Sequence, residues 1–295
     1  MNIVLTFNPA WAKHARLGVF SAISTNYKSD LTIYLMSGSL SNHDLDQFEQ
    51  VREATCKELG ARCSIKHINM LEHFPNYIKK PIKSKVVNWG EHNLYRLFIP
   101  KLIPDKRVLY VDTDALIIKD LSSLWGMDLG TNLLAACVDT WAVRETPEYH
   151  RDKLGIMQGG SYINDGVVLF NNEGLIAEGL FEKWVALANE RYDEFWIPDQ
   201  DVINMTTQNR QLLLDHIYNT AFCTLPNPRA PDPVSGFPEE NIHIVHWAGP
   251  IKPWDYIASR EIAKLLGDEY EPTRGIMFYN IWKKWMLEFK AKFPK

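Results

Sequence analysis

The sequence of 295 residues has no long hydrophobic run, no excess of basic charge and no closely paired cysteines. No apolar stretch approaches the roughly 18 residues that a membrane-spanning helix requires, which predicts a soluble chain. Lysine and arginine number 32 against 36 aspartates and glutamates, and this net charge of −4 argues against a nucleic-acid partner. The four cysteines (Cys56, Cys63, Cys137 and Cys223) form no CxxC pair, which is typical of reduced, buried thiols in a cytoplasmic protein.

What is present is the composition of a globular protein. Hydrophobic residues make up 46% and charged residues 23% of the chain, values that exclude a disordered, collagen-like or coiled-coil protein. The length suits one large α/β enzyme domain. The N-terminus opens with an apolar segment rather than a charged leader, so we expect no secretion signal and a cytoplasmic location.

Strand-like and helix-like segments alternate in the first half of the chain, the pattern of a mostly parallel sheet flanked by helices. The predicted strands are residues 3–7, 31–36, 63–68, 108–111, 133–138, 162–170 and 242–247. The predicted helices are residues 42–59, 91–98, 175–189 and 200–207. Ser41 and Asp44 form a capping box for the first of these helices, and Gly60 is placed to end it. Residues 226–238 contain five prolines, which predicts an ordered surface loop rather than a linker.

Two carboxylates, Asp112 and Asp114, follow directly on the apolar strand at 108–111. At the carboxyl end of a parallel strand the chain leaves the sheet, so both side chains can turn toward the crevice where α/β proteins bind ligands. Carboxylate oxygens that converge there suit a hard divalent cation. A solvated acidic turn is the alternative reading of this motif.

A second polar segment, residues 243–254, carries His246 at the end of an apolar strand and Lys252 beyond the bend at Gly249 and Pro250. An imidazole with two carboxylates is a plausible Mn²⁺ shell, and a nearby lysine neutralises phosphate as a point charge. A hydrogen-bonded core histidine is the alternative reading of His246.

Two further polar clusters stand where strands or turns end. Asn164 and Asp165 precede Gly166, which allows a ligand or another backbone to approach closely. Asp199 and Gln200 open a predicted helix, where a carboxylate also has an ordinary capping role. It is the occurrence of these clusters together with the other two segments that favours a functional site.

The ordered set of segments resembles glycosyltransferase family 8, the retaining, metal-dependent sugar transferases that include bacterial lipopolysaccharide galactosyl- and glucosyltransferases and, more distantly, glycogenin. The matching segments are the opening strand and residues 94–97, 110–114, 137–139, 164–166, 199–201 and 246–254. The resemblance covers residues 1–255 and implies a single α/β domain of the A-type glycosyltransferase (GT-A) fold. Residues 1–140 would form the nucleotide-sugar half, 141–255 the acceptor half, and 256–295 a helical C-terminal extension.

The resemblance also implies the ligands and the residues that bind them. It implies Mn²⁺, with Mg²⁺ as the alternative, held by Asp112, Asp114 and His246 on the diphosphate of a UDP-sugar. The implied donor-binding residues are Thr6, Asn8, Trp11, Arg96, Asp112, Thr113, Asp114, Asp139, Asn164, Gly249 and Lys252. The implied catalytic candidates are Gln200, Asp199 and Asp165.

The implied reaction is transfer of galactose or glucose to a saccharide acceptor, which the resemblance allows to be lipid-linked. Retention arises either from front-face attack or from a covalent intermediate, because Gln200 is a poor nucleophile whereas Asp165 and Asp199 carry carboxylates. Asp165 stands where the family more often has a small residue, which bears on donor or acceptor choice. Asn8 and Trp11 replace the usual uracil-reading residues, although an amide oxygen can accept a base N–H and an indole can stack.

Two other functions remain open on the sequence. Residues 111–117 resemble the nucleophile loop of haloacid dehalogenase-type phosphohydrolases but lack the glycine after the second aspartate. A non-catalytic carbohydrate-binding protein is the other alternative, against which the full set of Asp112, Asp114, His246 and Lys252 argues.

The C-terminal residues 276–295 have the spacing of an amphipathic helix. Phe278, Trp282, Trp285 and Phe289 fall on one face, and lysines fall largely on the other. Such a helix either lies on the anionic inner face of a membrane or docks on the domain.

Overall fold

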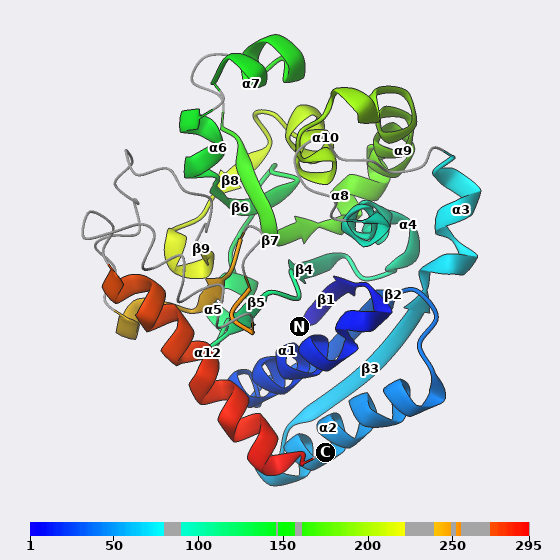
Figure 1. The fold of residues 1–295 in the computed structure, drawn as a ribbon. Helices are drawn as coiled ribbons and strands as arrows, with labels where there is room; N and C mark the ends of the chain where they lie inside the picture. The colour runs from blue at the N-terminus through cyan, green and yellow to red at the C-terminus, as the bar shows by residue number, and fades with distance from the viewer. Residues whose placement is uncertain are drawn as a thin grey trace.

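The computed structural model describes residues 1–79, 90–145, 147–156, 161–221, 239–248, 252–254 and 272–294. Within these ranges the chain forms one sheet of seven strands, in the order β3-β2-β1-β4-β7-β6-β8, and one of three strands, in the order β5-β10-β9 (Figure 1). The strands are β1 (Asn2–Phe7), β2 (Asp30–Ser37), β3 (Arg62–Asn69), β4 (Arg107–Val111), β5 (Ala115–Ile117), β6 (Leu134–Val138), β7 (Ile163–Asn171), β8 (Gln211–Leu213), β9 (Thr220–Ala221) and β10 (Ile244–His246).

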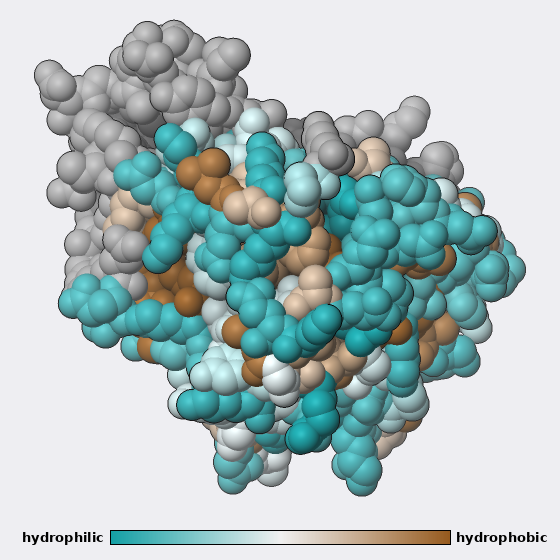
Figure 2. All heavy atoms as spheres, turned by 90° about the horizontal axis from the view of Figure 1, so that it is seen from below, coloured by the Kyte–Doolittle hydropathy of each residue, from teal (hydrophilic) through white to brown (hydrophobic). Residues whose placement is uncertain are grey.

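Helices cover both faces of the larger sheet. The α-helices described are α1 (Ala12–Thr25), α2 (Asn42–Leu59), α3 (Phe74–Tyr77), α4 (Ile99–Leu102), α5 (Ser122–Trp125), α6 (Thr140–Glu145), α7 (Pro147–Leu154), α8 (Asn172–Ala177), α9 (Leu180–Arg191), α10 (Pro198–Thr206) and α12 (Pro272–Lys292). One apolar cluster joins the sheet to α1, α2 and α12, and a second joins its opposite face to α4, α8, α9 and α10 (Figure 1). Seen from below, the outer surface is largely polar with scattered apolar side chains (Figure 2).

The larger sheet is mostly parallel, as the alternation of strands and helices predicted. Strands β1, β2, β3 and β4 run parallel to one another, and β7 runs antiparallel to both β4 and β6. The chain moves from β1 outward to β2 and β3, then returns to place β4 on the other side of β1. The strand order therefore reverses between β1 and β4, and the crevice beyond their carboxyl ends is where open α/β sheets bind ligands.

Helix α2 shows how local sequence sets an element's ends. The Ser41 hydroxyl accepts from the backbone N–H of Asp44, and the Asp44 carboxylate accepts in return from the Ser41 N–H, the capping box that the sequence predicted. Gly60 ends the helix in the left-handed conformation at φ 66°, where a residue with a side chain is strained.

Two predicted helices differ in the structure. Residues 175–189 are split between α8 and α9, because Gly179 takes a left-handed φ of 62° and interrupts the helix. Residues 91–98 form a 3₁₀ helix (Glu91–Phe98) rather than an α-helix. In an α-helix the N–H of residue 100 would donate to the Arg96 carbonyl, but Pro100 has no N–H. The Ile99 N–H donates to this carbonyl instead, across three residues, which is the 3₁₀ pattern.

Helix α12 docks on the domain through the aromatic face that the sequence predicted. The Phe20 ring of α1 lies 5.8 Å from Trp285 and 5.7 Å from Phe289, and Phe278 is also buried. The Lys292 ammonium pairs with the Glu58 carboxylate of α2. The aromatic side chains are therefore directed into the protein, so the helix docks on the domain, one of the two arrangements that the sequence left open. In the ranges described, none of the helices combines the length and apolarity needed to cross a bilayer.

Candidate active site

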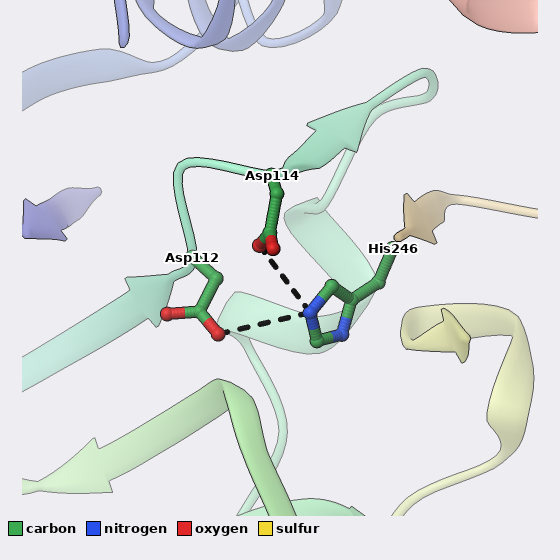
Figure 3. A group of neighbouring side chains, drawn as sticks. All are labelled: Asp112, Asp114 and His246. Atoms are coloured by element: carbon green, nitrogen blue, oxygen red, sulfur yellow. Dashed lines mark ion pairs between the residues drawn. The ribbon is translucent and has the colours of Figure 1, made fainter. Parts of the chain in front are cut away.

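Asp112 and Asp114 occupy the turn between β4 and β5, at the crevice beside β1. The Asp112 N–H donates to the Gly166 carbonyl at 2.7 Å, and the Ala115 N–H donates to the Asp112 carbonyl at 2.9 Å. These bonds fix a tight turn that holds both carboxylates on the same side (Figure 3). Sequence spacing placed them correctly because β4 is buried and ends at Val111.

His246 reaches the same point from β10, a strand more than 100 residues later. Strand β10 pairs antiparallel with β5, with His246 opposite Ala115, and the Trp247 N–H donates to the Asp114 carbonyl at 3.1 Å. The His246 Nε2 lies 3.7 Å from Asp112 Oδ2 and 3.4 Å from Asp114 Oδ1 (Figure 3).

These three side chains are placed to share one cation. One ligand atom from each of Asp112, Asp114 and His246 lies within 4.8 Å of the others. Two carboxylate oxygens and a neutral imidazole nitrogen are donors that divalent Mn²⁺ accepts, and Mg²⁺ takes the oxygens equally well. The donor set therefore fits the divalent metal that the sequence predicted.

Gly166 packs directly beneath this cluster. A Cβ at this position would lie 2.9 Å from both Asp112 Oδ2 and His246 Nδ1, and closer still to the His246 Cε1. Real Cβ atoms do not approach other atoms so closely, so only glycine leaves room for the two ligands here. The sequence indicated a close approach at Gly166 but not which groups make it.

Arg96 is buried among three carboxylates. Its guanidinium lies 2.8 Å from Asp112, 2.8 Å from Asp165 and 3.2 Å from Asp199. Burial acts to lower the pKa of Arg96, but the surrounding carboxylates outweigh it and raise the pKa well above its ordinary value. Burial likewise raises the pKa of Asp165 well above its usual range, despite the charge of Arg96.

Lys252 is the second buried cation of the site. Its ammonium pairs with Asp114 Oδ2 and donates to the Trp247 carbonyl at 2.9 Å. Burial acts to raise the pKa of Asp114, but Lys252 and His246 lower it below its ordinary value. Asp114 is therefore ionised and ready to bind a cation at neutral pH.

The remaining polar side chains form a second group beside the cation site. Asp139 Oδ2 accepts from Asn164 Nδ2 at 3.1 Å and from Gln200 Nε2 at 3.0 Å. The Gln200 Oε1 accepts from the Asp165 N–H at 3.1 Å. Asp139 after β6, Asn164 and Asp165 at the start of β7, and Gln200 of α10 thus lie near the carboxyl end of β4, because β7 runs antiparallel to β4 and starts where β4 ends.

The sequence profile of glycosyl transferase family 8 matches residues 2–258, most of the chain. The chain belongs to glycosyl transferase family 8. General stress protein A of Bacillus subtilis (strain 168) is 27% identical over 86% of this chain and 87% of its own length. The lipopolysaccharide 1,2-glucosyltransferase of Escherichia coli (strain K12) is 26% identical over 56% of this chain and half of its own length.

Solved structures of glycosyltransferases share the fold of this family 8 chain. The crystal structure of galactosyltransferase LgtC in complex with donor and acceptor sugar analogues superposes with a TM-score of 0.69, covering 95% of each chain at 21% identity. The predicted GT-A fold is therefore confirmed. Family membership makes the protein a glycosyltransferase, so the phosphohydrolase reading and the non-catalytic reading are both set aside.

The first loop of the family 8 domain follows β1 and begins at Asn8. The Asn8 amide oxygen accepts from the Ala10 N–H at 3.0 Å and caps a 3₁₀ helix (Pro9–Trp11). Thr6 bonds to the Tyr110 hydroxyl at 2.8 Å, and the Thr113 hydroxyl donates to the Thr6 carbonyl at 2.8 Å. Thr6 and Thr113 thus connect β1 to the turn after β4.

Trp11 is part of an aromatic group that joins this loop to the segment carrying Lys252. Its ring lies 5.2 Å from that of Trp254, edge to face, and the Trp254 ring stacks on His14 at 3.8 Å. Burial lowers the pKa of His14 to about 4, so this histidine is neutral at physiological pH. Gly249, the remaining predicted donor residue, lies outside the described residues, as do Cys223 and the predicted loop at 226–238.

Three side chains near the site were missed by sequence reasoning. His92 is a ring neighbour of Trp11 at 6.4 Å, the Tyr110 hydroxyl donates to Asp112, and Asn219 bonds to His246. His92 and Asn219 lie outside the motifs recognised in the sequence, so no signal in one sequence marks them. Tyr110 lies two residues before Asp112, and this proximity to the motif was the one sign in the sequence that it belongs to the site.

Proposed function

We propose that this glycosyltransferase transfers a hexose, galactose or glucose, from a UDP-sugar to a saccharide acceptor with retention of configuration and with the help of Mn²⁺. The observation that carries the proposal is the meeting of Asp112, Asp114 and His246 at the β1–β4 crevice. That crevice is the general nucleotide site of open α/β sheets, and a diphosphate needs a cation there.

The cation would be held by these three residues and would stabilise the negative charge that develops on the leaving diphosphate. Lys252, buried beside Asp114, would donate to the same phosphate oxygens. Arg96 orients Asp112 through a 2.8 Å ion pair and prevents the carboxylate from turning away from the cation. Thr6, Asn8, Trp11 and Thr113 would border the nucleoside end of the donor.

The sugar end of the donor would lie against Asp139, Asn164, Asp199 and Gln200. Gln200 has its amide fixed between Asp139 and the Asp165 N–H, and the second lone pair of its oxygen would face the positive charge that builds on the sugar ring. Arg96 contacts the carboxyl groups of both Asp165 and Asp199, and burial raises the pKa of Asp165 and so favours its protonated form, which weakens these groups as nucleophiles. These contacts favour front-face attack over a covalent intermediate.

Incubation with UDP-galactose or UDP-glucose tests the proposal. UDP release is expected with Mn²⁺, is expected to stop in EDTA, and is expected to accelerate when a saccharide acceptor is added. Asp112→Asn, Asp114→Asn and His246→Ala should each lower turnover by about 100-fold or more, whereas Asp46→Asn, on the exposed face of α2, should not. Metal-independent UDP release, or full activity in the three site variants, would refute the assignment.

A lipid-linked acceptor on the cytoplasmic face of a membrane is part of the same proposal. With its aromatic side docked, α12 exposes three lysines beside Leu287 and Glu288, a face of net positive charge suited to anionic headgroups; the lysines are Lys283, Lys284 and Lys290. Co-sedimentation with phosphatidylglycerol vesicles should therefore fall in the Lys283→Glu, Lys284→Glu double variant. Equal sedimentation of parent and variant would remove the membrane contact from the proposal.

A further inference from the structure

Asn219 connects the candidate cation site to the candidate sugar site. It is 1% exposed and lies between a 3₁₀ helix (His216–Tyr218) and β9. Strand β9 pairs parallel with β10, with Ala221 opposite His246. The backbone register therefore holds the buried Asn219 side chain beside the His246 ring.

The contact between these two residues decides which nitrogen of His246 carries the proton. His246 Nδ1 lies 3.0 Å from Asn219 Oδ1, an oxygen that can only accept. Nδ1 must therefore be the protonated nitrogen of the neutral ring. The lone pair is left on Nε2, the nitrogen that faces Asp112 and Asp114.

The other end of the Asn219 amide continues the chain of hydrogen bonds. Asn219 Nδ2 donates to Asn164 Oδ1 at 2.8 Å, and Asn164 Nδ2 donates to Asp139 Oδ2 at 3.1 Å. Gln200 donates to the same Asp139 oxygen at 3.0 Å. Each side-chain amide accepts through its oxygen and donates through its nitrogen. A single set of amide orientations therefore satisfies every hydrogen bond in the series from His246 to Gln200.

We propose that Asn219 is a positioning residue that fixes His246 for metal binding and ties this ligand to the residues facing the donor sugar. The inference rests on the cation site of the proposed function. Hydrogen-bond partners of metal-bound histidines set ring orientation and ligand basicity, and their loss typically weakens metal affinity by about 10- to 100-fold. Asn219 makes two hydrogen bonds that can be removed separately. Its oxygen accepts from His246, and its nitrogen donates to Asn164.

Two variants of similar size separate the roles of these hydrogen bonds. Asn219→Leu removes both hydrogen bonds and should weaken Mn²⁺ binding, measured by isothermal titration and by the electron paramagnetic resonance of free Mn²⁺, by about 10- to 100-fold. Asn219→Asp keeps an acceptor for His246 but cannot donate to Asn164. It should retain Mn²⁺ affinity within about threefold of the parent protein, while kcat/KM for the UDP-sugar at saturating Mn²⁺ falls about tenfold.

Thr220→Val provides the matched control. It removes the hydroxyl that donates to the His216 carbonyl at 2.8 Å, one residue away from Asn219, and Thr220 pairs with Val245 of β10 rather than with His246. This variant should bind Mn²⁺ as the parent protein does. If Thr220→Val and Asn219→Leu lose the same affinity, the effect is general destabilisation and the inference fails.

The remaining outcomes are equally decisive. If Asn219→Leu binds Mn²⁺ as tightly as the parent protein, the inference is overturned. It is also overturned if Asn219→Asp loses as much Mn²⁺ affinity as we expect for Asn219→Leu. This second comparison still tests the inference if Asn219→Leu does not fold. A parent protein that binds no Mn²⁺ overturns it as well. A parent that binds Mn²⁺ but releases no UDP from any UDP-sugar refutes the proposed function and leaves the positioning role of Asn219 standing.

Discussion

Replacing Gly166 by alanine should disable the metal site with little change to the rest of the fold. The added Cβ would lie 2.9 Å from Asp112 Oδ2 and from His246 Nδ1, and nearer to the His246 Cε1. Non-bonded carbon contacts are comfortable at about 3.5 Å or more, so the ligands must move by about 0.6 Å or more. Metal sites tolerate ligand displacements of only about 0.2 Å, which is why both ligands cannot remain in place.

The expected effect on Mn²⁺ affinity is a loss of at least about 10- to 100-fold, the range seen when ligand orientation is disturbed. Overpacking should also cost about 1–3 kcal/mol in the free energy of unfolding. Titration with Mn²⁺ reports the first quantity, and urea denaturation in EDTA reports the second. The assay therefore separates damage to the site from damage to the fold.

Gly18→Ala is the matched control. A Cβ at this position in α1 would lie 3.7 Å from Leu5 Cδ1, an ordinary contact, and alanine favours a helix over glycine by about 1 kcal/mol. This variant should keep full Mn²⁺ affinity and should not lose stability. If Gly166→Ala binds Mn²⁺ as tightly as Gly18→Ala, then Asp112 and His246 do not act together on the metal as we describe.

Three further perturbations have defined outcomes. Burial raises the pKa of Asp201 from 3.8 to about 6, so the folded state binds this proton more tightly and stability from this group is lost as pH rises from 4 to 6. In EDTA, the free energy of unfolding of Asp201→Asn should therefore fall less between pH 4 and pH 6 than that of the parent protein, by up to about 3 kcal/mol. An equal fall in both proteins would contradict this. Phe289→Ala, in the docked face of α12, should cost about 3 kcal/mol, whereas Leu287→Ala, at a 58% exposed position, should cost almost nothing; equal effects in thermal unfolding would contradict the docking. Lys252→Met should weaken UDP binding at saturating Mn²⁺ about tenfold, because a phosphate contact is lost. It should not weaken Mn²⁺ binding, because Asp114 no longer pairs with a competing cation. Unchanged UDP affinity in calorimetry would exclude the phosphate contact.

The sequence was most informative where one local rule determined the structure. Strand β4 and its two aspartates were predicted because a buried apolar strand that ends in two carboxylates has few alternatives. Helix α2 was predicted with both ends because Ser41, Asp44 and Gly60 each have a strong local preference. The break at Gly179 was readable by the same rule but was missed, since a single glycine also occurs inside helices.

Contacts between distant segments were the part that the sequence could not supply. The approach of Arg96 to Asp112, Asp165 and Asp199 depends on the antiparallel direction of β7, which a single sequence does not specify. Asn219 is an ordinary asparagine until the register of β9 against β10 places it beside His246. Family resemblance supplied the order of the motifs and their expected roles, and the structure supplied the hydrogen bonds that connect them.

The most direct test of the metal site is anomalous diffraction at the manganese edge from crystals grown with Mn²⁺ and UDP. The account predicts one peak per chain, bounded by the carboxylates of Asp112 and Asp114 and by Nε2 of His246, with the diphosphate on its open side. A peak elsewhere in the molecule, or none at saturating Mn²⁺ and UDP, would contradict it.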